Sequence, residues 1–233
     1  KQVADRTAVI IGARGGVGAA LADALDLGSS YANVIRLHRE SDLPFNILDE
    51  ASIATAAASL ADTQPPVQLV IVATGLLHSA GKGPEKSLRE LEPDWMMQNY
   101  HVNAVGPALV AKHFLPIMAK QGPICFAALS ARVGSISDNR LGGWHSYRAS
   151  KSALNMFIRN IAIEWQRKNA QSVVVGLHPG TVETQLSAPF KGNPAHERFL
   201  PARAAADMLG VLAGLKPEQS GQIFAYDGSV VAP

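Results

Sequence analysis

Short and almost uninterrupted apolar segments recur along the chain, each rich in residues that favour strands. They are TAVIIG at 7–12, NVIRLH at 33–38, VQLVIVA at 67–73, PICFAALS at 123–130 and SVVVGLH at 172–178. Strands that are apolar on both faces are typical of a parallel sheet with helices on each side. These segments therefore predict a sheet that water reaches on neither face.

The stretches between the segments carry the apolar spacing of helices. Leu21 and Leu25 lie one helical turn apart after the first segment, and Ile53 and Ala57 do so after a weaker strand that we expect at 44–47. Alternating strands and helices are the order of an α/β fold. We therefore predict a Rossmann-type, doubly wound parallel sheet with helices on both faces.

Two longer helices are predicted further on. One runs from Pro93 past Asn103 in one or two pieces, and the other runs from about Ser146 to Lys168. The most irregular segments follow strands and are 74–92, 134–145 and 185–200. In a doubly wound sheet, loops at the carboxyl ends of the strands form the ligand crevice, so these segments should meet at one rim. No linker divides the chain, which predicts a single domain over residues 1–233.

Composition and charge argue against several kinds of partner. Lysine and arginine number 21 against 19 aspartate and glutamate, so the net charge is +2, and no long run of one sign is present. Nothing in this balance calls for nucleic acid or an acidic membrane. No segment reaches the roughly 18 uninterrupted apolar residues of a membrane span. Because the sequence KQVADRTAVIIGA lacks a signal-peptide pattern, we expect a cytoplasmic protein.

The spacing of the histidines does not suggest a metal site. Besides His38 and His145, they are His78, His101, His113, His178 and His196. We expect no metal, and the chemistry inferred below needs none.

A glycine-rich turn, VIIGARGGVGAAL, follows the first predicted strand and opens the first predicted helix. This position is typical of a dinucleotide site, because the helix N-terminus offers unpaired N–H groups and a positive dipole end to a pyrophosphate. Gly12 permits the tight turn, while Gly16 and Gly18 permit close approach of the phosphate and of the helix. With Val17 they are the predicted cofactor-binding residues here; the alternative is an ordinary glycine-rich turn.

Basic residues beside this turn favour one of the two nicotinamide cofactors. A free ribose 2′-hydroxyl usually meets an acidic residue at the end of the second strand, whereas a 2′-phosphate calls for arginine. In IRLHRESD the expected acidic position is His38, and Arg39 follows it, while Arg14 lies in the glycine turn. We therefore predict NADP(H) rather than NAD(H). The alternative is that both arginines are solvated surface charges.

Further cofactor contacts are predicted where the next two strands end. Asn46 would hydrogen-bond the adenine and Ile47 would cover its face, although Asn46 also fits an ordinary turn and Asp49 fits a helix cap. Small residues in VATG, among them Ala73 and Gly75, would let a cofactor lie across the strand end. These positions complete the predicted adenosine side of the site.

The segment HSYRASKSALNMF places Tyr147 and Lys151 four residues apart, so both leave the same face of a predicted helix. A free tyrosine has a pKa of about 10, too high for efficient proton exchange near neutrality. A lysine ammonium within a few ångströms lowers that pKa. With a nicotinamide opposite, the pair has the parts for carbonyl reduction: a hydride donor and a phenol that protonates the developing alkoxide.

Together these motifs resemble the short-chain dehydrogenase/reductase family over essentially the whole chain. The likeness is greatest to its carbonyl-reductase branch, which includes C-factor-like and sniffer-like proteins. The residues that carry it are Gly12, Gly16 and Gly18, Asn103 in HVNAVGP, Tyr147 and Lys151 in YRASK, and the segment HPGTVET at 178–184.

The resemblance implies a role for each matching residue. Tyr147 is the general acid/base, Lys151 lowers its pKa and binds the nicotinamide ribose, and Asn103 holds a water in a proton relay. The segment that wraps the nicotinamide is matched by Pro179, Gly180, Val182 and Thr184. The resemblance also implies a substrate loop around 185–200 and a homodimer or homotetramer formed through the two long helices.

The sequence departs from the family at one catalytic position. The family's serine, which hydrogen-bonds the substrate oxygen, precedes a glycine by three residues, and the residue three before Gly134 is Ala131. Ser130 is the first candidate, if the chain shifts by one residue after the strand, and Ser135 is the second, if the loop folds back. Neighbouring strand residues point in opposite directions, so Ser130 cannot simply replace residue 131.

The predicted function is an NADPH-dependent carbonyl reductase, reversible as an alcohol dehydrogenase, that acts on a small carbonyl or secondary alcohol substrate. The same chemistry with NAD(H) is a second interpretation. A third is a nucleotide-binding regulatory or signalling protein with weak or lost catalysis. The alanine at position 131 favours this third interpretation, and the intact Asn103, Tyr147 and Lys151 oppose it.

Overall fold

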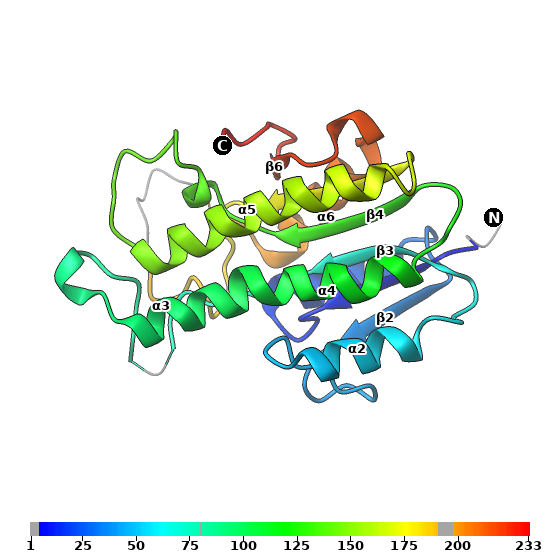
Figure 1. Ribbon diagram of the computed structural model, residues 1–233, viewed down its shortest axis with the longest axis horizontal. Coiled ribbons are helices and arrows are strands. Elements are labelled where there is room, and N and C mark those ends of the chain that lie inside the picture. The colour runs from blue at the N-terminus through cyan, green and yellow to red at the C-terminus, as the bar shows by residue number, and fades with distance from the viewer. Residues whose placement is uncertain (1–4, 80, 191–197) are drawn as a thin grey trace.

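The computed structural model describes residues 5–79, 81–190 and 198–233 (Figure 1). These residues form a parallel sheet of six strands in the order β2-β1-β3-β4-β5-β6. The strands are β1 (Thr7–Ile11), β2 (Asn33–Leu37), β3 (Val67–Val72), β4 (Ile124–Leu129), β5 (Ser172–His178) and β6 (Ile223–Ala225). After β2 the chain crosses back over β1 to place β3, so the winding reverses there. The predicted Rossmann-type, doubly wound sheet is confirmed.

Helices cover both faces of the sheet. One face is covered by α1 (Gly16–Leu27) and α6 (Pro201–Gly214), which contact each other. The other is covered by α2 (Glu50–Ser59), α4 (Gly106–Phe114) and α5 (His145–Gln166), which lie in front of the sheet in Figure 1. The sheet therefore forms the middle of three layers.

Alternation along the strands supplies both cores. In β1, Val9 and Ile11 are fully buried in the layer beneath α2, α4 and α5. Ala8 and Ile10 are equally buried but belong to the layer beneath α1 and α6. Successive side chains point to opposite faces of a strand, so an uninterrupted apolar run serves two helical layers at once.

A long helical segment precedes β4, as predicted. It consists of α3 (Pro93–Tyr100), a π-helical turn η2 (His101–Val105) and α4, followed by a 3₁₀ turn η3 (Leu115–Ile117). The remaining 3₁₀ turns of the described residues are η1 (Leu88–Glu90), η4 (Arg132–Gly134) and η5 (Pro217–Gln219). The π-helical turn contains Asn103, and such turns are frequent at functional sites.

The strand predicted at 44–47 is wrong. Pro44 has no N–H to give to a ladder, and the N–H of Phe45 donates to the carbonyl of His38 at 3.0 Å, which folds the segment into a loop. Phe45 is still buried, with its ring edge-on to Phe114. The segment is apolar because it fills the core beside the sheet, and β2 remains the edge strand.

Neither α6 nor β6 was predicted. The segment QIFAYD, which contains β6, is too short to be recognised as a strand by pattern alone. The helix of the Tyr147 segment, by contrast, begins and ends within two residues of its expected bounds. None of the described helices is long and apolar enough to cross a membrane.

Candidate active site

The carboxyl ends of β1, β3, β4 and β5 meet at one rim of the sheet, where most predicted site residues lie. The glycine turn leaves β1 there: Gly12 has φ +80, and its N–H donates to the carbonyl of Leu37 at 2.9 Å. A Cβ added at Gly18 would lie 2.3 Å from the carbonyl oxygen of Gly12. Both glycines are therefore required by the backbone, one by its dihedral angle and the other by close approach.

The start of α1 is free to receive an anion. Its N-cap is Gly15, no side chain caps the helix, and its first turn has no acidic residue. Gly16 faces the segment after β5, since a Cβ added there would lie 2.7 Å from Cγ2 of Thr184. The glycine turn and the predicted nicotinamide segment are thus adjacent. Val17, on the first turn of α1, is half-buried beside them.

Arg14 and Arg39 are exposed at this rim, which fits both the predicted contact with a 2′-phosphate and the alternative of solvated surface charges. Arg14 forms an ion pair with Glu40, and both side chains are about two-thirds exposed, at 66% and 67%. The Arg14 guanidinium hydrogen-bonds the Glu40 carboxylate and lowers the pKa of that carboxyl group. The glycine turn and the loop after β2 therefore lie together. Sequence reasoning did not foresee that Arg14 has an acidic partner.

Asn46 and Ile47 already make structural contacts. Oδ1 of Asn46 accepts from the N–H of Leu48 at 3.1 Å, a turn-forming bond of the kind considered as the alternative. Ile47 packs against α4, since a Cβ added at Gly106 would lie 2.5 Å from Cγ1 of Ile47. Asp49 caps α2 by accepting from the N–H of Ala51 at 3.0 Å, which confirms its assignment.

At the end of β3 lie the small residues of VATG, where a cofactor is predicted to cross the strand end. Ala73 continues the ladder through its N–H to the carbonyl of Ile11 at 2.8 Å, and Gly75 is exposed. Thr74 lies against Gly12, and its Oγ1 is buried without a hydrogen-bond partner among the described residues. Thr74 was not predicted to belong to the site.

Asn103 holds the loop after β3 to the helix that carries Tyr147. Its Oδ1 accepts from the N–H of Leu76 and its Nδ2 donates to the carbonyl of Leu76, both at 2.8 Å. Nδ2 also donates to Oγ of Ser150 on α5 at 3.1 Å. The side chain is fully buried. Asn103 therefore links three segments: the loop after β3, its own π-helical turn and α5.

Tyr147 and Lys151 lie on the first two turns of α5, as predicted. Nζ of Lys151 donates to the carbonyl of Leu129, the last residue of β4, at 2.7 Å, and it lies 5.8 Å from the centroid of the Tyr147 ring. Lys151 is 3% exposed. The helix is thereby tied to the rim of the sheet beside Tyr147.

Burial moves both groups toward their neutral forms. It raises the pKa of Tyr147 to about 12 and lowers the pKa of Lys151 to about 7. The sequence predicted the opposite direction for the tyrosine, because it assumed a lysine ammonium beside the phenol. In the structure that ammonium donates to a main-chain carbonyl, and loss of hydration dominates. Tyr147 is therefore protonated at neutral pH, which is the form that a general acid needs.

Neither candidate serine is hydrogen-bonded to Tyr147 within the described residues. Oγ of Ser130 donates to Oδ1 of Asn155 at 2.6 Å. Oγ of Ser135 donates to the carbonyl of Pro233 at 3.2 Å. Ala131 occupies the turn between them and is 8% exposed.

The segment after β5 folds over the glycine turn. Gly180 has φ +76, and Pro179 is half-buried beside it. Val182 is 5% exposed and forms a bridge with Phe199, so the main chain is fixed on both sides of the predicted substrate loop. That loop is described at 185–190 and 198–200, and the rest of it lies outside the described residues.

Aromatic rings gather over Tyr147 from three segments. The Trp144 ring lies 6.3 Å from the Tyr147 ring and 5.2 Å from the Phe190 ring, between centroids. Phe190 in turn lies 5.8 Å from the ring of His78. Phe190 and His78 were not predicted individually, although both belong to loops that were expected to meet here.

Comparison with known proteins establishes the family. Residues 13–226 match the profile of the family described as "Enoyl-(Acyl carrier protein) reductase". The chain is 33% identical over 157 residues to C-signal of Myxococcus xanthus, covering 67% of this chain and 90% of that protein. The chain belongs to the short-chain dehydrogenase/reductase family.

Other members are similar along most of the chain. Identity is 30% over 184 residues to 1-hydroxy-2-glutathionyl-2-methyl-3-butene dehydrogenase of Rhodococcus sp. (strain AD45), covering 79% of this chain and 76% of that one. NADPH-bound carbonyl reductase from chicken fatty liver superimposes with a TM-score of 0.83 at 24% identity, covering 100% and 96%. Carbonyl reductase Sniffer of D. melanogaster gives 0.82 at 19% identity, covering 99% and 100%. At these identities the structural matches establish the fold.

As a short-chain dehydrogenase/reductase, the protein is an NAD(P)-dependent oxidoreductase that acts on small-molecule substrates. Its residues fit the cofactor. The first turn of α1 has N–H groups without a side-chain cap, and the unpartnered hydroxyl of Thr74 lies beside the glycine turn. Within the described residues, no group of three or more His, Cys, Asp or Glu is placed to hold a metal ion.

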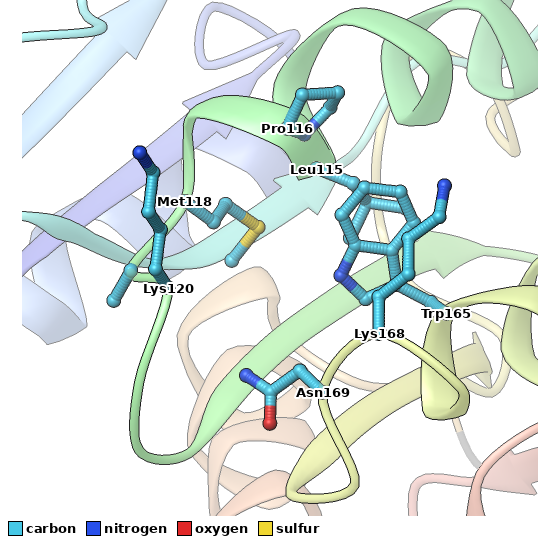
Figure 2. Close-up of a pocket in the computed structure, with 8 residues that line it drawn as sticks. Leu115, Pro116, Met118, Lys120, Trp165, Lys168 and Asn169 are labelled. Atoms are coloured by element: carbon cyan, nitrogen blue, oxygen red, sulfur yellow. The ribbon is translucent and has the colours of Figure 1, made fainter.

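A separate pocket of this dehydrogenase/reductase, of about 150 Å³, lies away from the rim (Figure 2). Its lining residues are Leu115, Pro116, Met118, Ala119, Lys120, Trp165, Lys168 and Asn169. They directly precede β4 and β5 in the chain, so the pocket opens at the amino-terminal edge of the sheet. In Figure 2 the Lys168 side chain lies beside the Trp165 ring, with Nζ 4.4 Å from its centroid. None of the predicted site residues lines this pocket.

Proposed function

We propose that the protein is an NADPH-dependent carbonyl reductase, reversible as an alcohol dehydrogenase. One observation carries the proposal. Tyr147 and Lys151 lie together on the first two turns of α5, at the same rim as a glycine turn that suits a dinucleotide. When bound, the reduced nicotinamide supplies a hydride, and Tyr147 supplies the proton for the carbonyl oxygen.

Tyr147 acts as general acid in reduction because its phenol holds its proton at neutral pH. Burial raises the pKa of Tyr147 to about 12, so the proton is present but held tightly. Donation to the developing alkoxide needs the positive charge of the cofactor or of Lys151 to lower that pKa. Lys151 supports the tyrosine from one helical turn away and binds the nicotinamide ribose. Asn103 keeps the loop after β3 in register with α5 through its bonds to Leu76 and Ser150, and it holds the relay water.

The substrate oxygen needs a second donor, and we assign that role to Ser130. Ser130 ends the β4 segment directly before Ala131, and it is 4% exposed. The role requires its hydroxyl to exchange Oδ1 of Asn155 for the substrate oxygen. Ser135 is less suited, because it is engaged with Pro233. If Ser130→Ala retained full turnover, Tyr147 would bind the substrate oxygen without a serine.

The cofactor contacts follow the two sides of the rim. Arg14 and Arg39 receive the 2′-phosphate, and Asn46 and Ile47 the adenine. The pyrophosphate and nicotinamide are held by Gly12, Gly16, Val17, Gly18, Ala73, Gly75, Pro179, Gly180, Val182 and Thr184. Binding constants for NADPH and NADH, measured by fluorescence titration, test this preference. Equal affinity for the two cofactors would contradict the preference for NADPH and leave NAD(H) as a possible cofactor.

Substitution of Tyr147 by Phe tests the chemistry. The variant keeps the ring but loses the proton, so turnover should fall by roughly 10³-fold. Binding of NADPH should stay within about twofold, because the glycine turn is untouched. Turnover that survives in Tyr147→Phe would remove the mechanism.

A second candidate function is a nucleotide-binding regulator with little catalysis. The alanine at position 131 favours it, as does the 33% identity to a protein named C-signal. A panel of aldehydes, ketones and activated diketones with NADPH separates the two. Turnover of any member supports the reductase, and silence of the whole panel together with tight NADPH binding supports the regulator.

A homodimer or homotetramer formed through the outer faces of the long helices completes the proposal. Met156 and Ile163 of α5 are exposed at 62% and 41%, and Met97 of α3 at 65%. Light scattering coupled to size exclusion would test the state, and a monomer at micromolar concentration would contradict it.

A further inference from the structure

The chain enters α5 through a left-handed segment. Gly142, Gly143 and Trp144 have φ values of 63°, 62° and 51°. Glycine adopts this conformation freely, but tryptophan has a Cβ and rarely does. Among the described residues, Trp144 is the only one other than glycine with positive φ. Such conformations persist only where surrounding contacts impose them, and they cluster at active sites.

Glu85 supplies those contacts from the loop after β3. Its main-chain carbonyl accepts from the N–H of Trp144 at 2.5 Å. Its carboxylate accepts from the N–H of Ser146 at 3.2 Å and from the Ser146 hydroxyl. Glu85 and Ser146 are 61 positions apart in the chain. The main chain and the side chain of this one distant residue therefore hold the segment from Trp144 to Ser146.

Glu85 is 2% exposed, and none of the ion pairs of the described residues includes it. A buried charge is costly unless hydrogen bonds and dipoles compensate it. Here it lies at the N-terminus of α5, where free N–H groups and the positive end of the helix dipole stabilise an anion. Trp144, the N-cap residue, makes no side-chain capping bond. Glu85 therefore caps the helix in its place.

This cap lies directly beside the reacting group. Ser146 is followed in the chain by Tyr147, and the Trp144 ring meets the Tyr147 ring at an interplanar angle of 72°. Arg148 braces the same segment, with Nε donating to the carbonyl of Gly143 at 3.0 Å. A shift at the start of α5 would move the phenol and the indole together.

We infer that Glu85 is a positioning residue for the reduction. It holds the left-handed segment before α5 and so fixes both the Tyr147 hydroxyl and the Trp144 indole that lies against Phe190 over the substrate side. The inference rests on the proposed function for its kinetic consequence, but the structural role of Glu85 stands apart from any substrate. Displacements of about 1 Å from a productive geometry can cost roughly 10²-fold in rate.

The test compares Glu85→Ala, Glu85→Gln and a matched control. Alanine removes both carboxylate contacts, so kcat should fall by tenfold or more, with NADPH affinity within about twofold of wild type. Glutamine keeps an acceptor for the Ser146 N–H and offers an amide donor to its hydroxyl, so it should restore kcat to within about threefold. Ser220→Ala removes a different buried hydroxyl, which accepts from the N–H of Val174 at 2.9 Å, and kcat should not change.

A merely structural role would lower the melting temperature of Glu85→Ala and Ser220→Ala alike, with kcat of the folded protein unchanged in both. That result would overturn the inference, as would a Glu85→Gln variant as slow as Glu85→Ala. If Glu85→Ala does not fold, Ser146→Ala removes the hydroxyl contact alone and should lower kcat by a few-fold. Normal kcat in Ser146→Ala, or a kcat of Glu85→Gln reduced by tenfold or more, would then contradict the inference.

A second readout does not depend on turnover. The indole N–H resonance of Trp144, assigned with Trp144→Phe, should shift or broaden in Glu85→Ala and stay in place in Ser220→Ala. If wild type reduces none of the carbonyl panel, the proposed function fails while this measurement still tests the position of Trp144. An unmoved Trp144 resonance in Glu85→Ala would overturn the positioning role whatever the activity.

Discussion

Two parts of the rim are built in different ways. The glycine turn, residues 12–18, is determined by its own backbone: one positive φ at Gly12 and one main-chain approach at Gly18. The corner that we propose to be catalytic comprises Glu85, Asn103, Trp144, Tyr147 and Lys151, and we call it the catalytic corner. It is assembled from three distant segments. The shape of the first part follows mainly from its own glycines, whereas the second part depends on contacts between its segments.

This difference separates binding from chemistry. Damage to the glycine turn should weaken cofactor binding, because its N–H groups and dipole act on the phosphates. Damage to the catalytic corner should lower turnover with cofactor binding intact. A substitution in the glycine turn that lowers turnover alone, or one in the catalytic corner that weakens cofactor binding, would contradict this division.

Gly18→Ala should produce the largest effect in the glycine turn. The new Cβ would meet the Gly12 carbonyl oxygen at 2.3 Å and its carbonyl carbon at 2.9 Å, and main-chain atoms cannot yield as a flexible side chain would. We expect NADPH affinity to fall by roughly tenfold to 100-fold and stability to fall by about 1–3 kcal/mol, a typical cost of overpacking. Isothermal titration and urea unfolding measure the two quantities.

Gly15→Ala is the matched control. Its φ of −72° suits alanine, and its Cβ would lie at 3.4 Å from the same oxygen. The loss of affinity should be threefold or less. If the two variants bind NADPH equally well, the close approach at Gly18 does not shape the cofactor site.

The glycine turn could be predicted from sequence because its causes are local. Seven consecutive residues contain the turn, the close approach and the helix start, and their order along the chain is their order in space. The spacing of Tyr147 and Lys151 was predictable for the same reason, since one helical turn relates them.

The rest of the catalytic corner could not be predicted, because its causes are tertiary. The phenol pKa depends on burial, and no pattern indicated that the Lys151 ammonium donates to Leu129. Glu85 lies in an irregular loop, where a glutamate usually signals a solvated charge. The error at 44–47 has a similar origin: Phe45 is apolar because it packs against Phe114, not because it belongs to a strand.

Lys151→Met should show the next largest effect, on how stability depends on pH. The pKa of Lys151 is about 7 in the folded protein and 10.5 as its ordinary value. Between these values the unfolded chain binds more protons than the folded one, so this lysine makes stability rise with pH across the window. Methionine removes that contribution. The variant should be more stable than wild type at pH 6.

Urea unfolding from pH 6 to 9.5 measures the difference in free energy of unfolding between the two proteins. This difference between the variant and wild type should shrink by up to about 1.4 kcal/mol per pH unit above pH 7. The range stops at 9.5 because Tyr147, with a pKa raised from 10.0 to about 12, makes stability fall with pH beyond 10. A difference that does not vary with pH would mean that Lys151 stays charged in the folded protein.

Glu40→Gln should give the smallest effect and refines the cofactor side of the comparison. Glu40 pairs with Arg14 at the surface, where ion pairs contribute little. The affinity for NADPH should therefore change only about two- to fivefold. Removing the carboxylate frees the guanidinium for a 2′-phosphate, so NADPH should bind more tightly while the affinity for NADH changes less.

Asp42→Asn changes an exposed acid in the same loop and controls for net charge. The gain should shrink at high salt, since these charges are solvated. Weaker NADPH binding in Glu40→Gln, with Asp42→Asn unchanged, would instead show that Glu40 orients Arg14 toward the phosphate.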